Sequence, residues 1–352
     1  MKRRFCGFSW LGIVVLVATM ATVASSVAPP SCMGSVYYDK YYQIGSLAAS
    51  EARSRISSRS MALPFQRKWI ALSNAGYAEP NGEQSLAALD GLSDVLGVSR
   101  GSQTLVEVHS APERPLWFAI YDDSSGFMAY MEVNSEAIRD VVATTSIFKV
   151  ASVENVKADF IFKNPESFAP QFGGNEFAVV TIANAVAAGA PAYAFRSFEF
   201  HDHYCPGVTS GILMAQYAKK YFSGRGPGSW FVQGLQPWCK EDALMVMLNA
   251  TPGKSGYGVI YSTPEQRKAW HPYEDAVNII FRFDSGSNTW EGLVLGFQWA
   301  DQTGCEQYQN STINKLCADL YYLNYLDQPE KFVRLLTTIK LDPGIHPKTL
   351  KY

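Results

Sequence analysis

Apolar residues recur along the chain at two spacings, and each spacing predicts a different kind of element. In the first half they return every three or four residues in two stretches, which predicts helices at 45–59 and 85–96. Apolar runs bounded by Gly, Pro, Asp and Ser then predict strands at 104–109, 116–121 and 126–133, with a further helix at 134–142. Two helices followed by a short series of strands form an α+β pattern.

The second half repeats this order of elements. Helices are predicted at 208–222 and 240–248, followed by strands near 256–261, 276–283 and 290–298. Asp90, Leu92 and Leu96 of the first half correspond to Asp242, Leu244 and Leu248 of the second, each by a difference of 152 (242 minus 90). The sequence therefore predicts two tandem α+β units, residues 33–175 and 176–352. Their helices would pack on antiparallel sheets, and the units would form a pseudo-dimer within one chain. Further oligomerisation is compatible with this organisation.

The charge of the chain argues against nucleic acid as a partner. The net charge is −2 over 352 residues, and no cluster of Lys and Arg occurs beyond the extreme N-terminus. A protein that binds nucleic acid needs a basic surface to neutralise phosphates.

The first 28 residues have the layout of a signal peptide or an N-terminal membrane anchor. Lys2, Arg3 and Arg4 precede an uncharged, mostly apolar run over residues 5–28. Cleavage after Ala24 is the preferred outcome, although the run is also long enough to span a bilayer. We therefore expect an extracytoplasmic protein, secreted or anchored, that meets a membrane only through this segment.

Export makes the cysteine count informative. Removal of Cys6 with the signal leaves Cys32, Cys205, Cys239, Cys305 and Cys317, an odd number in an oxidising compartment. Cys305 and Cys317 bracket a short polar segment and are the best candidates for a local disulfide. At least one other cysteine should stay free or bind a ligand.

Two histidines and a cysteine fall within five residues, at His201, His203 and Cys205. If residues 198–204 are extended, alternation places these three side chains on one side. Pro206 suits the first position of a helix, so Cys205 would lie at a helix N-terminus, where the dipole stabilises a thiolate. The stretch aligned with this motif in the first half, residues 38–42, offers no imidazole or thiol.

Imidazole and thiolate are ligands that suit zinc, and they point to a metal site. Cys239 would be the fourth ligand beside His201, His203 and Cys205. Asp242 shares a helix face with Cys239 and could orient a ligating histidine. Three alternatives remain open: Cys205 and Cys239 could form a disulfide, the motif could bind haem iron, or Cys205 could be a catalytic nucleophile.

The motif also carries a family resemblance. The run Phe-His-Asp-His-Tyr-Cys-Pro-Gly at 200–207, with Cys-Lys-Glu-Asp-Ala at 239–243 and Gly-Lys at 253–254, resembles the FmdE family, which takes its name from formylmethanofuran dehydrogenase. The resemblance covers residues 176–283 and implies an α+β core that commonly dimerises and holds a metal, usually zinc, at the histidines and cysteines. Asp202 replaces the family's glycine, and the C-terminal treble-clef zinc finger of many members is missing.

These observations favour one function and leave three others open. The favoured function is an exported, accessory binding protein that holds zinc or another transition metal, or a metal cofactor. The first alternative is a metal- or thiol-dependent enzyme, and the second is a haem-binding protein. The third is a structural protein whose cysteines are disulfide-bonded.

Overall fold

The computed structural model describes residues 36–59, 67–138 and 145–350. The expected signal segment at 1–28, Cys6 and Cys32 lie outside these residues, as does most of the helix expected at 134–142. What is described of that helix is a short 3-10 turn, Ser135–Ala137. No helix in the described ranges is long and apolar enough to cross a membrane.

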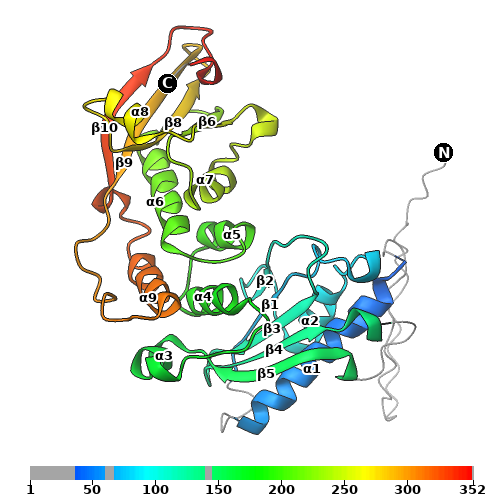
Figure 1. The fold of residues 1–352 in the computed structure, drawn as a ribbon. Coiled ribbons are helices and arrows are strands. Elements are labelled where there is room, and N and C mark those ends of the chain that lie inside the picture. Colours follow the sequence, from blue (N-terminus) through cyan, green and yellow to red (C-terminus); the bar gives the residue numbers. More distant parts are fainter. Residues whose placement is uncertain (1–35, 60–66, 139–144, 351–352) are drawn as a thin grey trace, which may run out of the picture. The chain divides into compact units, whose positions relative to one another are not determined.

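The N-terminal unit, residues 38–155, contains a five-stranded mixed sheet of order β2-β1-β3-β4-β5 (Figure 1). Its strands are β1 (Trp69–Ser73), β2 (Leu105–Glu107), β3 (Trp117–Asp122), β4 (Phe127–Val133) and β5 (Phe148–Asn155). β1 and β2 are parallel, whereas the other neighbours are antiparallel. Helix α2 (Ala88–Leu96) connects the parallel pair, as parallel strands require a crossover.

The C-terminal unit, residues 206–340, has a second five-stranded sheet of order β10-β9-β8-β6-β7. Its strands are β6 (Trp230–Gly234), β7 (Tyr257–Val259), β8 (Ala276–Asp284), β9 (Thr289–Phe297) and β10 (Val333–Lys340). β6 and β7 are parallel and are connected through α7 (Lys240–Leu248). Read in chain order, the strands of both units follow the same arrangement, so the α+β prediction is confirmed.

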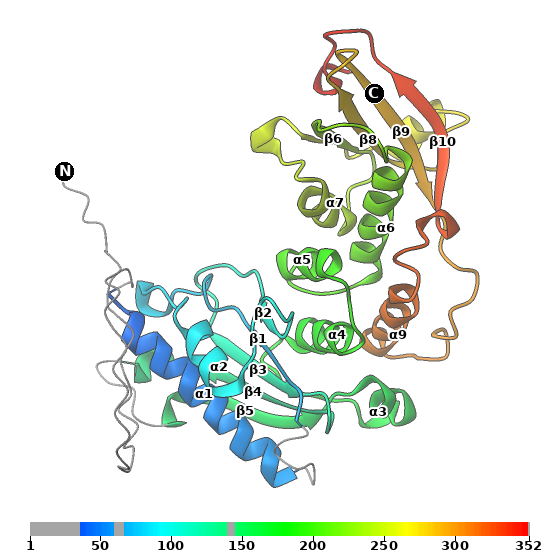
Figure 2. The ribbon, with the colours of Figure 1, turned by 180° about the vertical axis from the view of Figure 1, so that it is seen from behind.

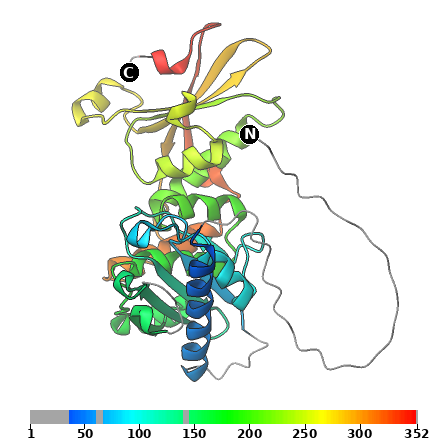
Figure 3. The ribbon, with the colours of Figure 1, turned by 90° about the vertical axis from the view of Figure 1, so that its right-hand side faces the viewer.

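One helix pair packs on each sheet. Helix α1 (Tyr38–Arg59) crosses the first sheet beside α2 (Figure 3), and both share a core with Phe118 and Ile120 of β3. Helix α6 (Pro206–Tyr221) and α7 lie beside the second sheet (Figure 2). They share a core with Ile280 and Leu293 of that sheet.

Glycines allow the two helices of each pair to approach closely. A Cβ on Gly45 of α1 would collide with the carbonyl oxygen of Ala88, and one on Gly211 of α6 would collide with that of Lys240. Ala88 and Lys240 differ by 152, whereas Gly45 and Gly211 differ by 166 (211 minus 45). The expected correspondence of residues 38–42 with 201–205 assumes a difference of 163, which is three less than the difference between these two glycines.

The remaining helices are α3 (Ala158–Lys163), α4 (Glu176–Ala187), α5 (Ala192–Phe200), α8 (Pro264–Ala269) and α9 (Ser311–Leu323). The second face of the first sheet, with Leu72 and Tyr121, shares a core with Val180 of α4. Helices α4 and α9 lie side by side in both views (Figures 1 and 2).

Two sequence expectations about these elements are wrong. Residues 198–200 form the last turn of α5 rather than an extended segment. Each sheet is mixed rather than antiparallel, because its edge strand β2 or β7 runs parallel to its neighbour, β1 or β6. Neither β1 nor β6 was anticipated. Both strands are short and almost wholly buried, so neither shows the alternation of a half-buried strand.

Candidate metal centre

Three of the expected ligands lie on the loop between α5 and α6, residues 201–205, which we call the ligand loop. Asp202 within it has φ of +64°, a left-handed conformation that glycine, Asn and Asp adopt most readily. This turn brings the rings of His201 and His203 to 4.4 Å between centroids. Aspartate can thus serve where the family pattern has glycine.

The ligand loop is fixed to the core by Tyr204. Its side chain is fully buried, its ring packs on Phe198, and its hydroxyl accepts a hydrogen bond of 3.0 Å from Thr209. The backbone N–H of Tyr204 donates to the hydroxyl of Thr181 in α4 at 3.2 Å. His203 and Cys205, on either side of this anchor, therefore have defined positions.

Cys205 occupies the N-cap of α6 and Pro206 its first helical position, as expected from the sequence. Gly207 follows, and a Cβ there would lie 2.7 Å from the Cβ of Cys239 and 3.2 Å from its sulfur. Only glycine lets the first turn of α6 come this close to Cys239. The Cys-Pro-Gly sequence is therefore explained by packing against the fourth ligand.

Cys239 lies at the start of α7, next to a buried ion pair. Lys240 Nζ is 2.6 Å from Glu241 Oε1, and both side chains are nearly inaccessible to solvent. Glu241 also accepts hydrogen bonds from the Tyr257 hydroxyl and from Asn278 Nδ2, the latter at 3.0 Å. These bonds join the first turn of α7 to β7 and β8.

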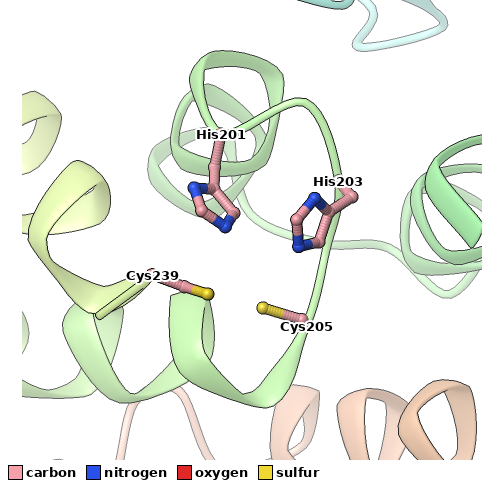
Figure 4. A group of neighbouring side chains, drawn as sticks. All are labelled: His201, His203, Cys205 and Cys239. Carbon is pink, nitrogen blue, oxygen red and sulfur yellow. The ribbon is translucent and has the colours of Figure 1, made fainter. Parts of the chain in front are cut away.

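The structure brings together all four expected ligands (Figure 4). One atom from each of His201, His203, Cys205 and Cys239 lies within 4.8 Å of the other three. Cys205 and Cys239 are free thiols in the structure, not a disulfide. These four side chains could hold a metal ion.

Carboxylates orient both imidazoles toward the cluster. His201 Nδ1 is 2.6 Å from Asp242 Oδ2, and His203 Nδ1 is 2.6 Å from Asp202 Oδ1. A carboxylate accepts a hydrogen bond only from a protonated nitrogen, so Nε2 is the ligand atom in each neutral imidazole. The Nε2 atom of His201 is buried without a hydrogen-bond partner among the described residues, as expected of a ligand atom.

Without a metal, the cluster shares protons unequally. The thiol of Cys205 donates to the sulfur of Cys239, and both histidines add to this effect, so the pKa of Cys239 is lowered. The same bond, together with burial, raises the pKa of Cys205. Burial disfavours the charged form of His201, but its hydrogen bond to Asp242 and the negative charges of Cys239 and Asp242 outweigh it and raise its pKa to about 9. Binding of a metal would therefore release protons.

The other cysteines and the N-terminal unit complete the surroundings. Cys305, just ahead of α9, and Cys317, within it, form a disulfide with an S–S distance of 2.02 Å.

Arg100 of the N-terminal unit binds Glu199 of α5 through two hydrogen bonds, of 2.8 and 2.9 Å.

His109 also contacts this end of α5. Its backbone N–H donates a hydrogen bond to the backbone carbonyl of Glu199 at 3.0 Å, and its ring stacks on Phe200. We call these interactions of Arg100 and His109 the Glu199 contacts. They hold the two residues that precede His201.

Sequence reasoning missed Asp202 as the partner of His203 and missed the Glu199 contacts altogether. Asp202 could have been found, because it lies between two expected ligands. Arg100 carries no local signal, since its partner is 99 residues away.

Comparison with known proteins agrees with the geometry of the cluster. A search of curated proteins found no match to the chain. Residues 200–314, which include all four cluster residues, match the family model "FmdE, Molybdenum formylmethanofuran dehydrogenase operon". The match covers less than half of the chain, so the similarity to this family is shown for residues 200–314.

Proposed function

We propose that the protein holds a zinc ion through His201, His203, Cys205 and Cys239 as an accessory binding protein. The observation that carries this proposal is the convergence of four ligand atoms, with both Nδ1 atoms already engaged by carboxylates. Two thiolates and two imidazoles are a donor set of structural zinc centres. Calcium and magnesium prefer oxygen ligands, so the donor set favours a transition metal.

A binding role is favoured over catalysis by the number of ligands. Catalytic zinc sites keep one position open for water, whereas four protein ligands complete a tetrahedral site. The raised pKa of Cys205 also makes its thiol a poor nucleophile in the metal-free state.

Elemental analysis of the purified protein, with counting of free thiols, tests the proposal. We expect about one zinc per chain, lost on Cys205→Ser or His201→Ala and retained on His271→Ala, which changes an exposed histidine outside the cluster. A metal-free protein with Cys205 and Cys239 oxidised to each other would contradict the proposal. A Soret absorbance band would show that the protein binds haem instead of zinc.

We further propose that residues 1–28 direct the chain out of the cytoplasm, on the basis of their charge and hydropathy. N-terminal sequencing of the mature protein tests this, with cleavage expected after Ala24. A cytosolic protein with an intact N-terminus would contradict it.

We also propose that the two units are copies of one ancestral unit that now act as a pseudo-dimer. Their shared strand order and the shared glycine contact between helices support this. Superposing the two units in a crystal structure of the protein should place Gly45 on Gly211 and Ala88 on Lys240. A different register would contradict common ancestry.

A further inference from the structure

A cavity of about 580 Å³ lies next to the ligand loop, outside the cluster itself. His203 and Asp202 form one wall, and the first turn of α4 forms another. The N-terminal unit supplies the rest of the lining, through Arg114, Trp117 and Glu132. Its volume falls in the range of small-molecule sites, roughly 300–1,000 Å³.

Two charged side chains in this cavity have no partner within the part of the chain that the structure describes. Arg114 and Glu132 make no side-chain hydrogen bond or ion pair with any residue that the structure describes. Asp202, by contrast, is engaged by His203. A cation and an anion that line one cavity without pairing to each other are both available to a ligand.

Aromatic rings form the apolar part of the wall. Trp117 is 4% exposed and stacks on Tyr130 at 6.0 Å between centroids. Phe177 of α4 lies 5.1 Å from the ring of His203, and Lys315 covers it at 5.2 Å. These contacts hold both rings, so the cavity offers a preformed surface for a hydrocarbon chain.

We propose that this cavity binds a small zwitterion, a molecule that carries both a carboxylate and an ammonium group. Arg114 would bind the carboxylate, because guanidinium groups match carboxylates in charge and geometry. Glu132 would bind the ammonium group, and Trp117 and Phe177 would contact the carbon chain. This site goes beyond the proposed function, because it requires the fold but no metal.

Calorimetric titration with three molecules of equal carbon number tests the proposal. The probes are 6-aminohexanoate, hexanoate and hexylamine, with L-leucine as a zwitterion whose charges lie closer together. We expect at least one of the two zwitterions to bind about tenfold more tightly than hexanoate and hexylamine, since each lost charge pair costs about a factor of ten.

Matched variants assign the two charges. Arg114→Ala and Glu132→Gln should each weaken zwitterion binding about tenfold, whereas Arg196→Ala and Glu136→Gln, exposed residues outside the cavity, should not. No binding of either zwitterion at 10 mM, on the order of the weakest specific affinities, would overturn the proposal. So would hexanoate binding as tightly as the zwitterions, or equal affinities in wild type and Glu132→Gln.

The zinc content of each preparation separates this proposal from the metal site. Arg114→Ala should keep its metal, because Arg114 is not among the four cluster residues. If the protein is purified without metal and still binds a zwitterion, the result would support the cavity site and contradict the zinc proposal. A zinc-loaded protein that binds neither zwitterion would do the reverse.

Discussion

Two carboxylates, Asp202 and Asp242, decide which imidazole nitrogen faces the metal cluster. Asp242 is two-thirds shielded from solvent and reaches His201 from α7, whereas Asp202 is 61% exposed and reaches its neighbour His203. The better shielded carboxylate should contribute more, because solvent screens an exposed hydrogen bond.

Replacement of Asp242 should weaken metal binding without removing a ligand. We expect Asp242→Asn to lower zinc affinity by about 10- to 100-fold, the usual effect of losing a partner behind a ligating histidine. Competition with a chromogenic chelator measures this. Asp90→Asn is the matched control, because Asp90 is the third residue of α2, as Asp242 is of α7, and accepts a hydrogen bond from Tyr38 instead. Equal affinities for wild type and Asp242→Asn would contradict the assignment.

Asp319 of α9 makes stability depend on pH. It is fully buried, and neither carboxylate oxygen has a partner among the described residues. Burial raises its pKa well above the ordinary value, opposed by the charge of Lys315, and Tyr204 and Cys205 are close enough to feel its charge. The folded state thus retains a proton that the unfolded state releases above about pH 4, so stability falls as pH rises from there.

Asp319→Asn should remove this dependence. Relative to the variant, the wild type should lose up to about 1.4 kcal/mol of unfolding free energy per pH unit until the folded-state pKa is reached. Urea unfolding of metal-loaded protein between pH 5 and pH 8 measures the difference, with surface Asp301→Asn as the control. A constant difference between variant and wild type across this range would refute the assignment.

The helix pair is the element that positions Cys205 against Cys239, and its spacing is set by glycine. Gly211 faces the carbonyl oxygen of Lys240, which is backbone and cannot rotate away. Gly211→Ala should therefore lower the unfolding free energy by about 1–3 kcal/mol, despite the better helix propensity of alanine. Gly253→Ala, where nothing lies within 4 Å, should be close to neutral. Denaturant titration compares the two, and equal stabilities would contradict the close packing.

Elements with a clear period could be predicted from the sequence, and those without one could not. Helix α2 was predicted at 85–96 and is observed at Ala88–Leu96, because its apolar residues recur with helical spacing. β1 and β6 are short buried runs, which periodicity cannot distinguish from loop or helix. Apolar and polar residues alternate by chance at 198–200, which lie in a helix. The position of the ligand loop was therefore predicted correctly, but the segment that leads into it was predicted as extended instead of helical.

In the whole molecule, the N-terminal unit lacks the cluster residues yet contacts the segment that carries them. Glu199 is 6% exposed and depends on Arg100 for its charge pairing. The four cluster residues could be singled out from the sequence because their residue types are distinctive. This long-range support could not, because Arg100 and Glu199 resemble ordinary surface residues until the fold pairs them.

Loss of Arg100 should therefore affect both stability and metal binding. Arg100→Ala leaves Glu199 buried without its partner, which should cost about 1–2 kcal/mol because Arg100 itself is partly exposed. We also expect faster release of zinc, measured by transfer to a chelator. Arg334→Ala breaks a solvent-exposed pair with Asp275 and should change neither quantity. Wild-type release kinetics in Arg100→Ala would show that the Glu199 contacts do not support the metal centre.

The four cluster residues come from two segments of chain, the ligand loop and the start of α7, with α6 and β6 between them. A metal ion bound to both segments would stabilise the folded chain. If it stayed bound, it would also cross-link the two segments in the unfolded chain. It would close a loop of 34 residues between Cys205 and Cys239 (239 minus 205) and so restrict the conformations open to the unfolded chain. The metal would then contribute to the mechanical integrity of the C-terminal unit even if no reaction ever occurs there.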